Sequence, residues 1–205
     1  MVSLKRGDNM GSIAAKPLSR RDIRTVAKIF HKIMDSKGYF DIIAFLELKM
    51  ADIDPDFVFE VVEDDKLPFA YAQSYPDEHL IQVRESVYYG AINNNGRDRF
   101  TLCHELGHCI FHGQKNISYL RADRELEKYK DPEWQADTFA GELLVPEEIA
   151  RTCTVLEISK KCGVSYTAAE IQKKRVLGQK NSHQTALKFG GVDNRKNMLQ
   201  SFANI

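Results

Sequence analysis

Residues 97–112 read RDRFTLCHELGHCIFH, and the two histidines in this stretch, His104 and His108, are four positions apart. Side chains four positions apart share one face of a helix, so these imidazoles can converge on one metal ion. A neighbouring face carries an apolar stripe with helical spacing, formed by Leu102, Leu106, Cys109 and Ile110. The pattern predicts a helix over about residues 98–112 that packs on a core and carries a metal site.

Glu105 completes an HExxH sequence. In a chain with this composition the expected number of HExxH matches by chance is roughly 0.01. Its side chain projects about 100° from that of His104, which favours contact with a water in the open position of the metal over a third equivalent ligand. This is the placement that a general base needs. Gly107 is unfavourable inside a helix, so its presence indicates close approach by another segment.

Zinc needs a third protein ligand from elsewhere in the chain. His112 continues the spacing of four, but three ligands along one helix span about 12 Å and cannot surround one ion, so we expect His112 at the surface or behind the ligands. Phe111 and Gln114 replace the glycine and histidine of the longer metzincin motif, which excludes that motif. A carboxylate from the following helix is the better candidate.

A helix is predicted over residues 132–144, with Asp131 as N-cap and Pro132 at the first helical position. Glu133 and Asp137 share one face, so one carboxylate can bind the metal while the other accepts the free N–H of a ligating histidine. We take Glu133 as the candidate ligand, although it could also complement the helix dipole. The spacing leaves other ligands open, namely Glu125, Glu127 and Glu142.

The composition is that of a globular domain: 205 residues, 43% of them hydrophobic, with 29 basic and 29 acidic side chains that cancel in net charge. No global field therefore steers the chain toward nucleic acid or an anionic membrane. The sequence has no apolar run of about 18 residues and no secretory signal, which predicts a cytoplasmic location. The four cysteines are expected to be free thiols in that reducing compartment.

Hydrophobic periodicity and turn residues divide the chain into a tail over residues 1–18, a main domain over 19–152, a helical extension over 153–178 and an unplaced segment over 179–205. Ser19 and Asp22 form a capping box that begins the first helix, and a second helix begins near Asp41. Further elements follow, namely strands at 57–62, 70–74, 79–83 and 87–92 and helices at 98–112, 132–144, 147–152, 155–162 and 166–177. Because the strands precede the helices, we predict an α+β fold with a small antiparallel sheet.

The sequence resembles the ImmA/IrrE family of zinc-dependent metallopeptidases in the segments RDRFTLCHELGHCIFH (97–112) and EWQADTFAGELLVP (133–146). With weaker likeness on both sides, the resemblance covers about 120 residues. It implies a small α+β domain with one Zn²⁺ between two helices. The implied zinc ligands are His104, His108 and Glu133, with Glu105 as the catalytic base and Asp137 in support. Gln135 stands where relatives often have Glu, which leaves Glu133 as the local carboxylate that can bind the metal.

Members of this family typically cleave or control helix-turn-helix repressors, often those of mobile genetic elements, so the resemblance implies a protein partner encoded nearby. Tyr88, Tyr89 and His112 are available to stabilise an oxyanion, and the sequence does not choose among them. Cys103 precedes a ligand and could approach the metal, although such cysteines usually pack in cores. The alternative function is a non-proteolytic regulatory module that binds its partner, with a structural metal or none.

Residues 155–178 have the spacing of a helix-turn-helix and are locally basic, which DNA contact would require. Small and apolar residues at these positions equally describe two helices that pack on a core. We therefore do not expect direct DNA binding.

Overall fold

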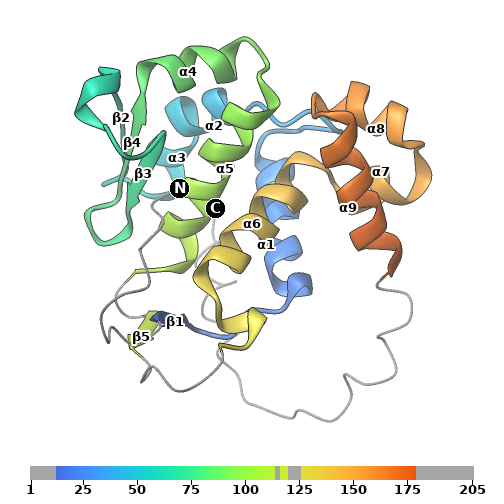
Figure 1. The fold of residues 1–205 in the computed structure, drawn as a ribbon, viewed down its shortest axis with the longest axis horizontal. Helices are drawn as coiled ribbons and strands as arrows, with labels where there is room; N and C mark the ends of the chain where they lie inside the picture. The colour runs from blue at the N-terminus through green and yellow to red at the C-terminus, as the bar shows by residue number, and fades with distance from the viewer. Residues whose placement is uncertain (1–12, 114–115, 120–125, 179–205) are drawn as a thin grey trace.

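The structure is a computed structural model that describes residues 13–113, 116–119 and 126–178 (Figure 1). The unplaced segment 179–205 lies outside these residues. The helices are α1 (Arg20–Ile33), α2 (Ile42–Leu48), α3 (Met50–Ile53), α4 (Glu85–Ile92), α5 (Gly96–Phe111), α6 (Pro132–Leu144), α7 (Glu147–Thr152), α8 (Val155–Cys162) and α9 (Tyr166–Gly178). The strands are β1 (Ile13–Ala15), β2 (Val58–Val62), β3 (Ala72–Tyr75), β4 (Leu80–Arg84) and β5 (Ile117–Tyr119). The α+β class predicted from the sequence is confirmed.

Local capping explains why the helices begin where the sequence predicts. Ser19 and Asp22 form the expected capping box at α1, because each side chain accepts a hydrogen bond from the other residue's backbone N–H. Asp131 accepts from the backbone N–H of Glu133 at the start of α6, and Pro132 occupies the first turn. Short-range signals of this kind therefore fix where α1 and the site-bearing helix α6 begin.

The main sheet has the order β2-β4-β3, in which β3 pairs with β4 antiparallel and β2 pairs with β4 parallel. It is thus mixed, where the short connections predicted a purely antiparallel sheet. A short 3₁₀ turn (Pro76–Glu78) joins β3 and β4 as neighbours, which leaves the other edge of β4 for β2. The strand order makes β3 an edge strand, and Figure 1 shows it facing α5.

The fourth predicted strand, over residues 87–92, is wrong, because residues 85–92 form the helix α4. Aromatic and β-branched residues favoured a strand there. In the structure Val87 and Ala91, four positions apart, are the buried residues of this segment. Burial of an i, i+4 pair is what a helix provides, so tertiary packing outweighs the local preference.

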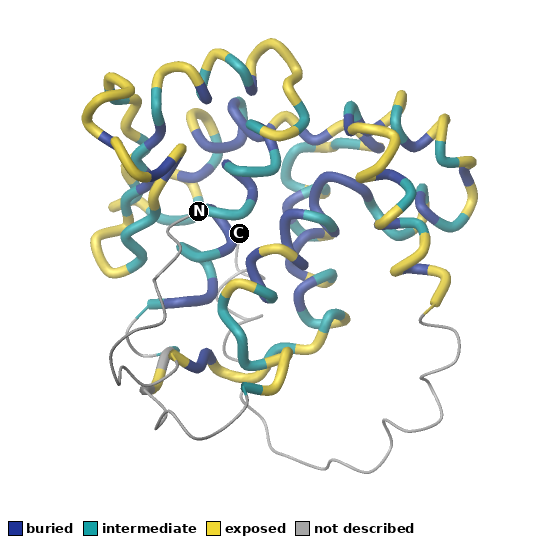
Figure 2. Tube along the Cα trace, viewed as in Figure 1, coloured by how far each residue is buried: buried dark blue, intermediate teal, exposed yellow. Residues whose placement is uncertain are grey.

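One hydrophobic core joins α1, α2, α5, α6 and the sheet, and the buried stretches in the centre of Figure 2 trace it. The predicted extension 153–178 contributes to this same core through α8 and α9, with Ile158, Cys162, Ala169 and Val176 fully buried. The predicted tail 1–18 also contains structure, because β1 pairs antiparallel with β5 and buries Ala14 and Ala15. A three-residue strand that pairs with a segment about a hundred positions away gives no local signal.

A fully buried arginine ties α5 to the turn between α8 and α9. The guanidinium of Arg99 donates to the carbonyl oxygens of Cys162 and Gly163, and also to that of Phe40. Gly163 has a positive φ of 63°, and a Cβ built there would lie 2.7 Å from Arg99 Nη1. Only glycine therefore fits this turn, and the tight packing of the turn holds α8 and α9 against the core.

Candidate metal centre

Helices α5 and α6 lie side by side, and Gly107 is the position that allows their close approach. A Cβ at Gly107 would lie 3.1 Å from Ala136 Cα and 3.2 Å from Phe139 Cδ1, closer than nine in ten real Cβ contacts. The close approach predicted from Gly107 is thereby confirmed. It brings the first turn of α6 next to the histidine face of α5.

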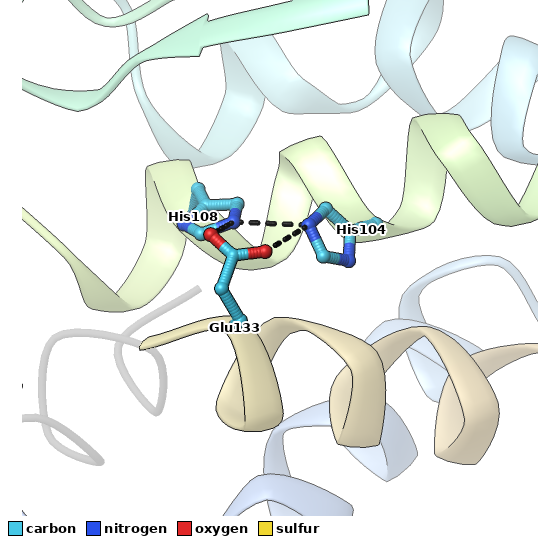
Figure 3. Close-up of side chains that lie close together, drawn as sticks. All are labelled: His104, His108 and Glu133. Carbon is cyan, nitrogen blue, oxygen red and sulfur yellow. Dashed lines mark hydrogen bonds and ion pairs between the residues drawn. The ribbon is translucent and has the colours of Figure 1, made fainter. Parts of the chain in front are cut away.

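Three side chains converge in this place: His104 and His108 from α5 and Glu133 from α6 (Figure 3). The Nε2 atoms of the two histidines are 3.0 Å apart. Glu133 Oε2 lies 3.4 Å from His104 Nε2, and Glu133 Oε1 lies 3.5 Å from His108 Nε2. Ligand atoms at about 2.1 Å around a tetrahedral zinc are about 3.4 Å from one another, so this donor set fits such an ion.

Asp137, one turn after Glu133 on α6, reaches the opposite nitrogen of His104. Its Oδ1 lies 3.0 Å from His104 Nδ1. Burial opposes protonation of His104, but hydrogen bonds with Asp137 and Glu133 outweigh it and raise the pKa of His104 to about 9. The hydrogen bond with His104 is in turn the main cause that lowers the pKa of Glu133. In the metal-free chain these two carboxylates therefore favour a positive charge at the centre, the place that a cation would take.

Glu105 points toward the sheet and is held by the edge strand β3. Its Oε2 accepts hydrogen bonds from the backbone N–H of Ser74 (2.9 Å) and from the Ser74 hydroxyl (2.6 Å). Its Oε1 accepts none from the described residues. Burial raises the pKa of Glu105, and the bonds from Ser74 oppose this shift. One oxygen is thus fixed while the other is available to bind a proton.

His112 lies behind His108, as one of the two placements predicted from the sequence, and it is 6% exposed. Its Nδ1 lies 2.8 Å from His108 Nδ1, and its Nε2 lies 3.0 Å from the amide oxygen of Gln135. Burial, followed by the neighbouring His112 and His104, lowers the pKa of His108 to about 4. His108 is therefore neutral at physiological pH, which is the state in which an imidazole binds a metal.

The other candidates take different places. Glu142 is fully buried against two arginines, and Glu127 pairs with Lys130, so neither joins the cluster; Glu125 lies outside the described residues. The Tyr88 hydroxyl donates to Glu47, which raises its pKa to about 12. Cys103 is fully buried, and burial raises its pKa to about 12, which fits core packing. All four cysteines are free, as predicted.

The roles of two residues at the site, Ser74 and Gln135, were not predicted from the sequence. Ser74 contacts Glu105 across 31 positions, and nothing local marks it, since a serine near the end of a strand is common. Gln135 was noted only as a departure from the usual glutamate. Its signal is a polar residue next to Ala136 on a helix that packs into the core, where a buried amide must find partners.

A sequence model of the IrrE N-terminal-like domain, Peptidase_M78, matches residues 60–172, which is more than half of the chain. The chain belongs to this family. The matched segment of this ImmA/IrrE member contains β3, α5 and α6, and with them all the residues of the candidate metal centre. No curated protein and no solved structure matches the chain closely enough to be a relative.

Membership in the Peptidase_M78 family supports a metallopeptidase activity for this chain, and the family is generally zinc-dependent. Within the described residues of this family member, no helix is long and apolar enough to cross a membrane.

Proposed function

We propose that this chain is a zinc-dependent endopeptidase that hydrolyses a peptide bond in a protein regulator. The carrying observation is the convergence of His104 Nε2, His108 Nε2 and the Glu133 carboxylate, with Glu105 held beside them. Two imidazoles and one carboxylate are the donor set of known catalytic zinc sites. When bound, zinc polarises a carbonyl group and makes water more acidic.

The residues around the centre have separate tasks in this proposal. Asp137 accepts the Nδ1–H of His104 and so orients the ring toward the centre. Glu105 takes a proton from the attacking water on its free Oε1 and gives it to the leaving amine. Burial supports this task, because a raised pKa brings the carboxylate closer to the neutral pH at which a base must also release its proton.

Ser74 has a positioning task. Two hydrogen bonds to one oxygen of Glu105 prevent the carboxylate from turning toward the metal ligands, and they tie the base to the edge strand β3. Because β3 pairs only with β4 among the described strands, an extended peptide would add as a further strand along the part of its outer edge that the bond from Ser74 to Glu105 does not occupy. This arrangement would place the peptide beside Glu105.

For the substrate we propose a helix-turn-helix repressor encoded next to this gene, on the strength of the family. The experiment incubates the purified full-length chain with that neighbouring regulator, after metal analysis, and follows cleavage by mass spectrometry. Glu105→Gln is expected to lower the cleavage rate by about 10²–10⁴-fold and to retain the metal. Glu170→Gln, on the exposed face of α9, removes the same charge and is expected to cleave normally.

Three results would decide against parts of this proposal. Equal cleavage by the wild type and Glu105→Gln would remove the base role of Glu105. A stable complex without cleavage would favour the alternative, a regulatory module that acts by binding. A chain that binds no divalent metal would exclude the zinc enzyme altogether.

A further inference from the structure

Gln135 is a fully buried amide whose orientation is fixed by two backbone carbonyls. Its Nε2 donates to the carbonyl oxygen of Lys16 (2.8 Å) and to that of Tyr129 (2.8 Å). Carbonyl oxygens can only accept, so the NH₂ group must face them. The amide oxygen therefore faces the other way, toward His112.

The direction of this amide sets the proton of His112. Gln135 Oε1 can only accept, so His112 Nε2, at 3.0 Å, must donate. In a neutral imidazole one nitrogen donates and the other accepts, which makes His112 Nδ1 an acceptor. The nitrogen that faces it, at 2.8 Å, is His108 Nδ1.

The same rule then sets the proton of His108. Because His112 Nδ1 accepts, His108 Nδ1 carries the proton and donates it. His108 Nε2 is left with its lone pair, and this atom lies 3.0 Å from His104 Nε2 and 3.5 Å from Glu133 Oε1. Two backbone carbonyls thus determine, through two side chains, which nitrogen of His108 can bind a metal.

We propose that Gln135 and His112 form a positioning relay that holds the proton of His108 on Nδ1 and presents the unprotonated Nε2 to the metal. This rests on the proposed zinc site. The two ligating histidines are therefore oriented by different means, because His104 meets a half-exposed carboxylate, Asp137, directly, whereas His108 is held by a buried neutral chain. The relay needs an amide at position 135, since a carboxylate there would face two carbonyl oxygens with no proton to donate.

The first test reads the tautomer without metal and without substrate. Long-range ¹H–¹⁵N spectra of the metal-free full-length chain are recorded at neutral pH, with histidine labelled by ¹⁵N. In the wild type, His108 is expected to show a protonated Nδ1 and an unprotonated Nε2. A wild-type His108 protonated on Nε2 would overturn the relay, and this result needs no variant to fold.

The second test measures zinc affinity by competition with a chromophoric chelator. His112→Phe removes the acceptor of His108 Nδ1–H and is expected to weaken zinc binding by about 10–100-fold. His112→Asn restores an oxygen acceptor near the place of the lost Nδ1, so it is expected to recover most of the affinity and the wild-type tautomer of His108. Unchanged affinity in His112→Phe would overturn the proposal.

A matched control separates the relay from general damage to the core. His31→Gln changes another histidine whose two ring nitrogens both have partners, Ser36 Oγ and the carbonyl oxygen of Leu143. It is expected to keep zinc affinity within about twofold, because His31 lies outside the relay. Thermal melts of each metal-free variant verify folding before the affinities are compared.

The outcomes distinguish this proposal from the proposed function. A wild type that binds zinc with the expected His108 tautomer, but cleaves nothing, leaves the relay standing and removes the peptidase. A wild type that cleaves its target, together with a His112→Phe variant of unchanged zinc affinity, removes the relay alone.

Discussion

Helix α6 carries two carboxylates with opposite fates, Glu133 in its first turn and Glu142 in its last. The Glu133 side chain is 72% exposed and faces two histidines. The Glu142 side chain is 0% exposed and binds Arg20 and Arg24 of α1, at 3.1 and 2.7 Å. Both glutamates meet basic groups, so proximity to positive charge does not by itself separate a functional carboxylate from a structural one.

Glu142 and Glu133 differ in whether their basic partners can give up a proton. An arginine keeps its proton at any physiological pH, so the charges around Glu142 are permanent and closed to other ligands. An imidazole can exchange a proton for a metal ion, so the charge beside Glu133 is replaceable. The C-terminal end of α6, with Glu142, therefore stabilises the fold, whereas the N-terminal end, with Glu133, is accessible to a cation.

The largest effect is expected from Glu142→Gln, which keeps the shape of the side chain and removes its charge. Two arginines then lose their buried partner, so the free energy of unfolding should fall by about 3–5 kcal/mol. Urea denaturation of the metal-free chain measures this loss. Glu148→Gln, which removes the exposed partner of Lys28, should cost less than about 1 kcal/mol. Equal losses in the two variants would contradict a structural role for Glu142.

Glu133→Gln is expected to give the converse result. Zinc affinity should fall by more than about 100-fold, because even the residues behind metal ligands are worth about 10–100-fold. The metal-free stability should change by less than about 1 kcal/mol, because solvent screens the ion pair that this exposed side chain makes with His104. Chelator competition and urea denaturation on the same samples measure both quantities. If zinc still protects Glu133→Gln from thermal unfolding as it does the wild type, Glu133 is not a ligand.

Sequence reasoning located the half of the site that local geometry controls. His104, Glu105 and His108 follow from spacing on one helix, and the start of α6 follows from Asp131 and Pro132. The choice of Glu133 over Glu142 did not follow from spacing, because it depends on which face α1 covers. A helix pattern describes one element, whereas that choice is a property of three helices packed together.

The remaining features depend on contacts between distant segments. Ser74 contacts Glu105, 31 positions away, and Gln135 contacts Lys16, 119 positions away. No short window of sequence therefore contains both residues of either contact. The strand predicted at 87–92 failed for the same reason, because burial of Val87 and Ala91 overrides strand preference. Gly107 is the exception. A glycine inside a helix lowers the stability of that helix, so its presence indicates that another segment packs closely against it.

Gly107→Ala tests how strongly the candidate metal centre at the N-terminal end of α6 depends on the distance between α5 and α6. The new methyl group would meet the backbone of Ala136, which cannot turn away as a side chain could. Overpacking should cost about 2 kcal/mol, partly offset by the roughly 1 kcal/mol that alanine gains in a helix. We expect a net loss of about 1 kcal/mol in the free energy of unfolding and about tenfold weaker zinc binding, because the proposed ligands sit on both helices.

Gly96→Ala, in the first turn of the same helix, is the matched control for this prediction. Its Cβ would lie 3.7 Å from the nearest atoms, an ordinary contact. Stability and zinc affinity should therefore remain at the wild-type level. Equal zinc affinity in Gly107→Ala and Gly96→Ala would show that the site tolerates a change in helix spacing.

The smallest effect is expected at the C-terminal end of α6, where His31 Nε2 donates to the carbonyl oxygen of Leu143 at 2.7 Å. Burial lowers the pKa of His31 below its ordinary value of 6.5, against the opposing effect of its hydrogen bonds. Below that pH the unfolded chain binds the proton more readily than the folded chain, so the stability that neutral His31 contributes is complete above about pH 6.5 and is lost as the pH falls.

Urea midpoints of the metal-free wild type and of His31→Gln, measured from pH 8 to pH 5, isolate this contribution. Other groups titrate in the same range, but they are common to both proteins and cancel in the difference. The wild type should therefore lose more stability than the variant as the pH falls below 6.5, and zinc affinity should be the same in both. Parallel pH profiles would show that the bond from His31 to α6 survives protonation, because Nε2 donates in either state, and that the cost of burying the charge is negligible there.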